Sequence, residues 1–436
     1  MPSGIAPLRI ALLGYRSHPH VGGQGIYVKY LSKALVDAGH AVTVISGPPY
    51  PDLDPRVKLV ELPSLDLFAT KSHVLALRWR HLKSFTDTFE WFSMLTGGFS
   101  EPYTFGRRAT KYFRKHAGEY DIVHDNQSLC YGLLEIEKLG IPVVATVHHP
   151  ITRDYRLALA AARWRDKPLV ARWHSFLHMQ KKVARKLKHV VTVSEQSQQD
   201  IAEAFHRPAE RTPIMYNGID TDTFHRIPGI AREDKLLITT ASADQPLKGL
   251  RYLLKAVAKL RAAAHPELRL LVIGKLKQGG STARLLKRLK LQDAVSFVSG
   301  ISTEALVEHY NRACLAVTPS LYEGFGLPAG EAMACETPVI SSDGGALPEV
   351  VGDAGYLVRA GDSEALARAI DELLADEQQR NNMAAAGRAR IVAQFSWREK
   401  ARRLTHYYHS IIGEASNSDV LDDAMLADEV ESGSPA

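Results

Sequence analysis

Short apolar, β-branched runs alternate with helical patterns along most of the chain, and this alternation constrains the fold more than any other feature. The pattern begins with an apolar run at 10–13, a glycine-rich loop, a helical segment at 26–38 and a second apolar run at 41–45. A strand, a helix and a second strand in this order form a βαβ unit, whose strands lie parallel in one sheet. The sequence therefore predicts an α/β fold built on parallel strands.

The same pattern starts again near Leu236, after a stretch at 207–215 in which two prolines flank charged residues. In the first series we expect further strands at 122–123, 143–147 and 190–193, and a helix at 132–139. In the second series we expect strands at 236–240, 268–273, 295–298, 315–318 and 338–341, and helices at 250–264, 282–289, 304–311 and 328–335. Two Rossmann-like domains are therefore predicted, over 1–211 and 212–395.

The charge of the chain is uneven. Its formal net charge is +6, yet the segment 413–436 is acidic and contains no lysine or arginine, so the body of the protein is more basic than the total suggests. A basic body suits phosphates, anionic lipid headgroups or nucleic acid, without choosing among them. The acidic tail is poor in apolar residues and is expected to be disordered.

Three cysteines, Cys130, Cys314 and Cys335, lie far apart in the sequence. They form no CxxC pair, so they suggest neither a zinc site nor a disulfide framework. The apolar run near the N-terminus is too short for a secretion signal, and no apolar run reaches the ~18 residues of a membrane span. These observations predict a cytoplasmic protein.

A glycine-rich loop with Gly22, Gly23 and Gly25 lies between the first strand and the first helix. Backbone amides in such a loop, together with a helix N-terminus, can face an anion, although a plain tight turn explains the glycines equally well. The glycines do not have the GxGxxG spacing of a nicotinamide site, and the second strand ends in Ser46-Gly47 rather than in an acidic residue. A dehydrogenase is therefore not indicated.

A second glycine-rich bend, at 324–326, has Glu323 before it and Glu331 in the helix that follows. Pro328 suits the first turn of that helix. Carboxylates accept hydrogen bonds well from the hydroxyl groups of sugars and ribose. Either glutamate alone reads more simply as a solvated surface residue, but the bend, the helix start and the paired acids together indicate a binding site.

The spacing from Glu323 to Glu331, with GFGLP between them and PVISSDGGALPEVV after them, resembles the donor-site signature of retaining glycosyltransferases of family 4. The resemblance extends to the GGxG loop, to His148 after the VVATV strand, to the NGID segment at 217–220 and to a Lys-Gly pair at 248–249. It implies the GT-B fold, in which two Rossmann-like domains face each other across a cleft. An N-terminal acceptor domain, a C-terminal donor domain and a helix at about 396–412 that crosses back to the first domain are then expected.

The resemblance also implies roles for single residues. Lys248 would contact the donor diphosphate, Glu331 the nucleotide ribose, and Glu323 the transferred sugar, while His148 would touch that sugar near its reacting carbon. The loop with Gly22, Gly23 and Gly25 would close over the phosphates. The remaining donor-binding positions implied by the family are Asn217, Gly249 and the backbone of Phe325, Gly326 and Leu327.

One departure from the family pattern concerns the cation that usually accompanies the lysine. Ser242 stands where the family usually has an arginine, so part of the expected clamp is missing or comes from Lys275 or Lys277. The DxD at Asp220 and Asp222 could suggest a metal-binding transferase, but a lone DxD is a weak signal. We expect neither a metal nor a cofactor, because the resemblance favours a front-face displacement in which the leaving phosphate helps to deprotonate the acceptor.

The predicted activity is therefore the transfer of a sugar, with retention, from a nucleotide-sugar donor to a small-molecule, glycan or lipid acceptor. A UDP-sugar is the expectation that the family supplies for the donor. A sugar-nucleotide epimerase on the same fold and a non-catalytic sugar-nucleotide-binding subunit remain as alternatives. Nucleic acid is not expected as a partner, because no recognised RNA or DNA motif accompanies the basic segments.

Two segments, 64–118 and 151–189, interrupt the βα alternation, and both are basic. Apolar residues of the first recur at spacings of three or four and predict one helical stripe: Leu75, Trp79, Leu82, Phe85, Phe89 and Phe92. The stripe either packs on the core of the first domain or lies in the headgroup layer of an anionic membrane. The second interpretation predicts a peripheral protein on the inner face of the membrane.

Overall fold

The computed structural model describes residues 6–18, 23–69, 79–241 and 244–431. The chain forms two compact units. Unit 1 comprises 1–193, 197–215 and 400–436, and unit 2 comprises 194–196 and 216–399. The crossing from Met215 to Tyr216 lies a few residues from the boundary that the sequence predicted at 211.

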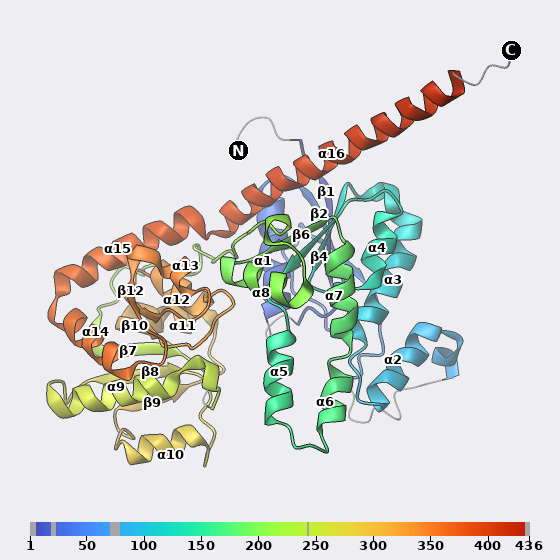
Figure 1. The fold of residues 1–436 in the computed structure, drawn as a ribbon. Coiled ribbons are helices and arrows are strands. Elements are labelled where there is room, and N and C mark those ends of the chain that lie inside the picture. The colour runs from blue at the N-terminus through green and yellow to red at the C-terminus, as the bar shows by residue number, and fades with distance from the viewer. Residues whose placement is uncertain (1–5, 19–22, 70–78, 242–243, 432–436) are drawn as a thin grey trace. The chain divides into compact units, whose positions relative to one another are not determined.

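Unit 1 contains a sheet of six strands in the order β3-β2-β1-β4-β5-β6. All of its neighbouring strands pair in parallel. The strands are β1 (Arg9–Gly14), β2 (Ala41–Ser46), β3 (Lys58–Glu61), β4 (Ile122–Asn126), β5 (Val143–Val147) and β6 (His189–Thr192). Strands β1 and β5 consist largely of apolar residues, and every residue of β4 is buried, because helices cover both faces of the sheet (Figure 1).

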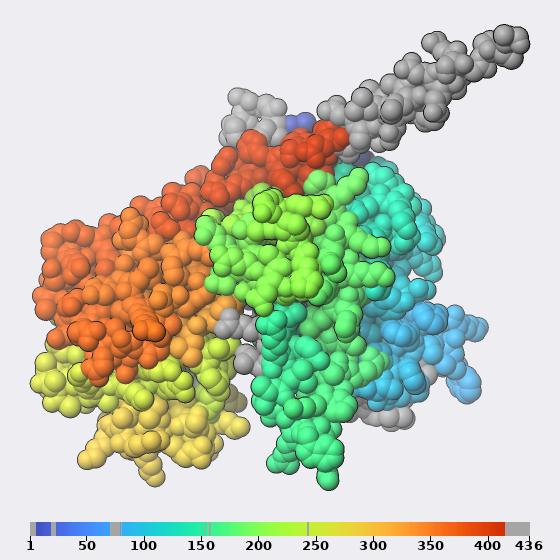
Figure 2. Space-filling view, in the orientation of Figure 1, coloured from blue at the N-terminus to red at the C-terminus, as the bar shows by residue number. Residues whose placement is uncertain are grey.

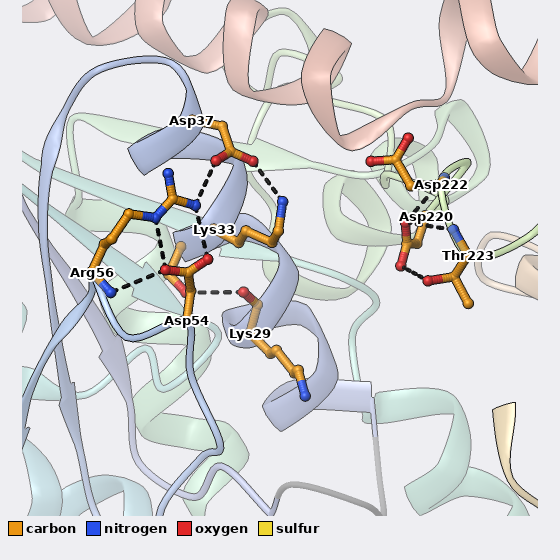
Figure 3. Close-up of polar contacts among 9 residues, drawn as sticks. Lys29, Lys33, Asp37, Asp54, Arg56, Asp220, Asp222 and Thr223 are labelled. Atoms are coloured by element: carbon orange, nitrogen blue, oxygen red, sulfur yellow. Dashed lines mark hydrogen bonds and ion pairs between the residues drawn. The ribbon is translucent and has the colours of Figure 1, made fainter. Parts of the chain in front are cut away.

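The helices of unit 1 follow the strands and also fill the two interrupting segments. They are α1 (Gly23–Asp37), α2 (Phe85–Leu95), α3 (Glu101–His116), α4 (Tyr131–Glu137), α5 (Thr152–Ala161), α6 (Lys167–Trp173), α7 (Phe176–Lys186) and α8 (Glu195–Phe205). Short 3₁₀ helices are η2 (Trp79–Lys83), η3 (Ala117–Glu119) and η4 (Ala209–Arg211). Arg56 joins the segment before β3 to the end of α1, since its guanidinium binds both Asp54 and Asp37 (Figure 3).

Unit 2 repeats this topology with the strand order β12-β11-β10-β7-β8-β9. Its strands are β7 (Glu233–Thr240), β8 (Arg269–Ile273), β9 (Val295–Val298), β10 (Ala313–Thr318), β11 (Val339–Ser342) and β12 (Tyr356–Val358). Its helices are η5 (Pro246–Lys248), α9 (Leu250–Ala263), α10 (Ser281–Arg288), α11 (Thr303–Arg312), α12 (Leu327–Ala334), α13 (Leu347–Val351), η6 (Gly352–Ala354), α14 (Ser363–Ala375) and α15 (Glu377–Gln394). Counted along each unit, both sheets have the Rossmann order 3-2-1-4-5-6, which confirms the predicted fold class.

The last helix, α16 (Trp397–Glu431), begins in unit 2 and continues in unit 1 from Lys400 onward. It is longer than the helix expected at about 396–412, and the expectation of a disordered tail from 413 is corrected. The segment from Glu414 to Glu431 contains neither proline nor glycine. Extending a helix that has already formed costs little, so the polar composition of this segment does not stop it.

Two other expectations also need correction. Helix α1 begins at Gly23 rather than at Ile26, so Gly23 and Gly25 lie in its first turn and not in the preceding loop. The stripe from Leu75 to Phe92 is not one helix, because Ser84 accepts a hydrogen bond from the amide of Asp87 and caps a new helix at Phe85. Leu75 itself lies outside the described residues.

Helices α3 and α4 pack closely enough that two glycines are needed at their contact. A Cβ added to Gly132 would lie 2.3 Å from the backbone oxygen of Gly106, and one added to Gly106 would lie 2.5 Å from the sulfur of Cys130. Neither helix can take a larger residue there without moving.

We expect Gly132→Ala to lower the free energy of unfolding by about 1–3 kcal/mol, the usual cost of overpacking. Gly118→Ala is the matched control, because a Cβ at Gly118 meets nothing within 4 Å. Urea denaturation of both variants measures the difference. Equal midpoints for the two variants would contradict the close approach of α3 and α4.

Candidate active site

The strand order reverses between β7 and β10 in unit 2, and the loops that follow these two strands carry the predicted donor residues. In doubly wound sheets a crevice opens at such a reversal, beyond the carboxyl ends of the strands, and ligands bind there. Lys248 ends η5 after β7, and Glu323 follows β10. The amide of Leu321 donates to the carbonyl of Leu247 at 2.7 Å, so the two loops are joined directly.

Gly249 allows this junction. Its φ of +66° is left-handed, and a Cβ there would lie 1.8 Å from the carbonyl oxygen of Pro319. No side chain other than hydrogen fits. Gly249 therefore belongs to the site through its backbone, and it leads directly into α9.

Lys248 and Glu323 form an ion pair, with 2.7 Å between Nζ and Oε1. The side chains are 30% and 12% exposed, so solvent screens the pair only in part. Ser320 donates a second hydrogen bond to the same carboxylate oxygen at 2.8 Å. The Glu323 carboxylate thus holds the lysine ammonium beyond the carboxyl ends of β7 and β10, where the strand order reverses.

The backbone of Glu323 is fixed as well. Its carbonyl accepts from the amide of Ala346 at 2.9 Å, and its amide donates to the carbonyl of Gly344 at 3.3 Å. Gly345 has a φ of +70°, and a Cβ there would lie 2.3 Å from the Glu323 oxygen. The Gly-Gly pair after β11 therefore serves to bring the backbone against Glu323.

Helix α12 begins at the bend after Glu323. Gly326 has a φ of +105° and is the residue before the helix, and Pro328 occupies the first turn. The Phe325 side chain is buried against Phe395, with 5.9 Å between ring centroids, which leaves only its backbone for a ligand. Pro328 has no amide hydrogen, and the amides of Ala329 and Gly330 donate to the carbonyl of Gly326 at 3.1 and 3.3 Å. The amide of Leu327 is thus the one at this helix start that can face an anion.

Glu331 lies one turn further along α12. Burial raises the pKa of its carboxyl group to about 7. The hydroxyl of Tyr310, from α11, donates to Glu331 Oε2 at 3.4 Å and lies 3.1 Å from the hydroxyl of Thr240 at the end of β7. Tyr310 could not be identified from the sequence, because the sequence shows only that it lies in a predicted helix.

Asn217 lies in unit 2 on a segment that pairs with the region after α15. The neighbouring Ile219 donates its amide to the Phe395 carbonyl at 2.6 Å. The side-chain oxygen of Asn217 is buried without a hydrogen-bond partner, which is costly for a polar atom.

The DxD aspartates have a local structural explanation. Asp220 Oδ1 accepts from the amides of Asp222 and Thr223, and Oδ2 accepts from the Thr223 hydroxyl at 2.5 Å (Figure 3). Both carboxylate oxygens of Asp220 are thus used in hydrogen bonds that stabilise a local turn. Across the described residues, no three His, Cys, Asp or Glu side chains gather in a way that could hold a metal ion.

In unit 1 the strand order reverses between β1 and β4, and His148 follows the next strand, β5. Its Nε2 lies 2.7 Å from Asn126 Oδ1, and the Asn126 amide donates to the carbonyl of Gln24 in the first turn of α1. Since Asn126 uses its amide toward Gln24, its oxygen accepts, which places the His148 proton on Nε2 and leaves Nδ1 as an acceptor.

The backbone of His148 is held from two further sides. Its amide donates to Gln127 Oε1 at 2.6 Å, and its carbonyl accepts from the Ser197 hydroxyl at 2.7 Å. Burial first, and then the charge of Lys400, lowers the pKa of His148 to about 3, so the imidazole is neutral. His149 has a different partner, Asp154, at 3.5 Å, as expected for adjacent residues of an extended chain.

In unit 2 the structure joins Lys248 directly to Glu323, and in unit 1 it links His148 through Asn126 to Gln24 in the first turn of α1. Gly25 is required by a close approach, since a Cβ there would lie 2.1 Å from the His18 carbonyl oxygen. Gly22 and Ser242 lie outside the described residues. Lys275 and Lys277 are exposed on the loop after β8, and no hydrogen bond or ion pair of theirs with Glu323 is recorded in the described part of the chain.

Comparison with known proteins agrees with this geometry. Residues 220–390 match the family described as "Glycosyl transferases group 1", and residues 21–223 match "Glycosyltransferase Family 4". The MMP alpha-(1->4)-mannosyltransferase of Mycolicibacterium hassiacum is 45% identical over 413 residues, covering 94% of this chain and 100% of that protein. A D-inositol 3-phosphate glycosyltransferase of Geodermatophilus obscurus is 28% identical over 438 residues, covering 93% and 90%.

Solved structures support the fold. Sucrose-phosphate synthase from Thermosynechococcus elongatus superposes with a TM-score of 0.66 at 24% identity, covering 93% of this chain and 100% of that one. The Anabaena protein HepE in complex with UDP and glucose gives a TM-score of 0.63 at 18% identity, covering 92% and 100%. The chain belongs to the group 1 glycosyltransferases of family 4 type, with the GT-B fold. It is therefore a glycosyltransferase, as the resemblance implied.

Proposed function

We propose that this enzyme transfers a mannosyl residue, with retention, from a nucleotide-sugar donor to a hydroxyl group of a carbohydrate acceptor. The observation that carries the proposal is the Lys248–Glu323 pair at the strand reversal of unit 2, in a chain 45% identical to an α(1→4)-mannosyltransferase along almost its whole length. Common nucleotide-sugar donors of hexoses carry the sugar in α linkage. An α-linked product would then mean retention.

Breaking the bond between sugar and phosphate builds negative charge on the leaving diphosphate. In the proposed reaction the ammonium of Lys248 leaves the Glu323 carboxylate and pairs with this diphosphate, and the amide of Leu327 at the start of α12 faces the same charge. Fixed charges and dipoles aimed at developing charge lower a barrier by several kcal/mol. No cofactor or metal enters this scheme, because the lysine ammonium and the amide of Leu327 stabilise the negative charge.

The released Glu323 carboxylate accepts hydrogen bonds from the hydroxyl groups of the transferred sugar. His148 contributes from unit 1, where its neutral imidazole and fixed tautomer suit a hydrogen bond to a sugar hydroxyl near the reacting carbon. Glu331 binds the ribose hydroxyls. With the leaving phosphate as the proton acceptor for the incoming hydroxyl, no further base is required.

The acceptor is proposed to bind to unit 1. A cavity of about 140 Å³ there is lined by aromatic side chains and one arginine, among them Phe89, Phe99, Tyr103, Phe176 and Arg172. Aromatic faces and an arginine suit the apolar faces and hydroxyl groups of a glycan. Nucleic acid is not proposed as an acceptor, because the sequence contains no recognised nucleic-acid-binding motif.

Product analysis tests the function. The purified protein is incubated with UDP- and GDP-sugars and with mannose oligosaccharides, and mass spectrometry follows the products. Release of nucleoside diphosphate together with a lengthened oligosaccharide supports transfer. An isomerised donor would instead show an epimerase, and donor binding without turnover would show a non-catalytic subunit.

We predict that Lys248→Ala lowers kcat at least ~10²-fold, because one charge-stabilising group typically supplies about 3 kcal/mol. Lys259→Ala is the control, since Lys259 forms an exposed ion pair with Glu364 on the surface of α9. Steady-state kinetics compares the two. Near-normal turnover of Lys248→Ala would place the essential cation elsewhere.

We predict that Glu331→Gln weakens donor binding more than it slows the chemical step. Because the pKa of Glu331 is raised to about 7, the carboxylate loses its charge as the pH falls through 7, and donor affinity of the wild type should fall with it. Calorimetry at pH 6 and pH 8 should show this dependence in the wild type and none in the variant. An unchanged donor Kd in the variant would make Glu331 a structural residue.

We also propose a peripheral contact of unit 1 with anionic membrane, on the observation that most of the described stripe is exposed. Trp79, Leu82, Phe85 and Phe92 are 88%, 49%, 61% and 57% exposed, whereas Phe89 packs on Tyr103. The segment from η2 to α2 forms part of the molecular surface (Figure 2, blue). Within the described residues, no helix has the length and apolar character of a membrane span.

Vesicle co-sedimentation tests this contact. The wild type should bind vesicles containing anionic lipid and not zwitterionic vesicles, and both salt and the double change Trp79→Ser with Phe85→Ser should weaken binding. Leu357→Ser, which removes an apolar residue 37% exposed in unit 2, is the control. Wild-type protein that stays in the supernatant at low salt would exclude the membrane and favour a soluble acceptor.

A further inference from the structure

Helix α16 brings a buried lysine into unit 1. Lys400 is only 3% exposed, and its Nζ donates to the carbonyl oxygen of Met215 at 2.8 Å. Burying an ammonium group is costly, and an apolar side chain of similar length would fill the same space at a lower cost. Packing alone therefore does not account for a lysine at this position.

The Lys400 ammonium lies over an aromatic ring that in turn contacts His148. Its Nζ is 5.0 Å from the centroid of the Tyr27 ring. The same ring packs edge-on against the His148 imidazole, with 4.6 Å between centroids and an interplanar angle of 86°. The lysine, the tyrosine and the histidine thus follow one another in contact, and they come from α16, α1 and the end of β5.

Tyr27 transmits the position of the lysine because it has little freedom of its own. The residue is 5% exposed, and its hydroxyl lies 3.3 Å from the hydroxyl of Thr146. Thr146 also lies 2.7 Å from Nε2 of His124, whose other ring nitrogen is hydrogen-bonded to Tyr408 of α16. A buried polar network therefore joins α16 to the sheet beside His148.

The place of Lys400 in the chain is also special. Met215 is the last residue of unit 1 before the long stretch of unit 2 at 216–399, and Lys400 is the first residue of unit 1 after it. Inside unit 1, their hydrogen bond joins the two segments that connect this unit to residues 216–399.

We propose that Lys400 is a positioning residue for His148: through the Tyr27 ring it holds the imidazole in the orientation needed for sugar transfer, and through Met215 it ties that orientation to the two connecting segments. The role in transfer rests on the function proposed above. The contact of Lys400 with His148 through Tyr27 does not, and it can be tested without a donor.

The titratable groups of the described network that Lys400 joins include Tyr27, His124, His148 and Tyr408. Burial raises the pKa of both tyrosines and lowers that of His124 to about 3, so these three stay neutral near neutral pH. Burial lowers the pKa of Lys400 itself to about 7. The lysine is thus charged throughout the acidic range in which His148 takes up its proton.

The test uses Lys400→Met in the full-length chain, which keeps the length of the side chain and removes its charge and its hydrogen bond. Thr405→Val is the matched control, because Thr405 is also buried on α16 and loses one hydrogen bond, to His40 at 2.8 Å. His148 imidazole signals, assigned by their loss in His148→Gln, are followed by NMR from pH 8 down to the unfolding pH of each variant.

We expect the His148 signals of Lys400→Met to shift and to begin titrating at a higher pH than in the wild type, since a nearby positive charge has been removed. We expect kcat to fall about 10-fold, as for a slightly misplaced group, while the donor KM changes less than about 2-fold. Thr405→Val should change neither the His148 signals nor kcat. Unaltered His148 signals in Lys400→Met, or the same changes in Thr405→Val, would overturn the proposal.

Tyr27→Leu provides a second test should Lys400→Met not fold. This variant keeps the lysine and removes the ring between it and His148. The His148 signals should shift and kcat should fall in the same direction. A His148 spectrum like that of the wild type would show that the ring does not hold the imidazole. If the NMR changes occur but no sugar is transferred, the proposed function fails and the positioning contact stands.

Discussion

The reversal of strand order at the middle of each sheet is the constraint on which the rest of this protein depends. Helices cover both faces of a parallel sheet, so polar groups gather at the carboxyl ends of the strands. Where the strand order reverses, the loops after two adjacent strands run in opposite directions and leave a crevice between them. In unit 2 these loops carry Lys248 and Glu323, and in unit 1 they carry Asn126 and the start of α1, beside His148. Glycines such as Gly249 and Gly345 then allow the backbones to approach.

The charged groups of the site are balanced before any ligand binds. Glu323 neutralises Lys248, and burial keeps His148 uncharged and raises the pKa of Glu331. In the proposed reaction a diphosphate changes this balance, because it would offer the lysine a stronger partner than a single carboxylate and would free Glu323 for hydroxyl groups. In this proposal the same side chains stabilise the fold and bind the donor.

The strands and the main helices of both units could be predicted from the sequence because buried parallel strands are apolar and short, and the helices between them are periodic. Glu323 and Glu331 could be predicted from the glycine-rich bend and the helix start, and Lys248 only through the family resemblance. The ion pair between Lys248 and Glu323 could not be predicted. Tyr310, Asn126 and Lys400 could not be found, since each gains its meaning from a partner distant in sequence. Apolar periodicity predicted one helix from Leu75 to Phe92 and missed the cap at Ser84. Polar composition predicted disorder after residue 412 and missed how readily an existing helix is extended, as in α16.

The return of α16 has a consequence for biosynthesis. Leu404, Tyr408 and Ile411 are almost fully buried in unit 1, although they follow the whole of unit 2 along the chain. A ribosome releases the N-terminus first, so the sheet of unit 1 is complete long before these side chains leave the exit tunnel. Unit 1 therefore keeps part of its interior uncovered until these residues of α16 have been translated, and apolar surface exposed in this way favours aggregation during that interval.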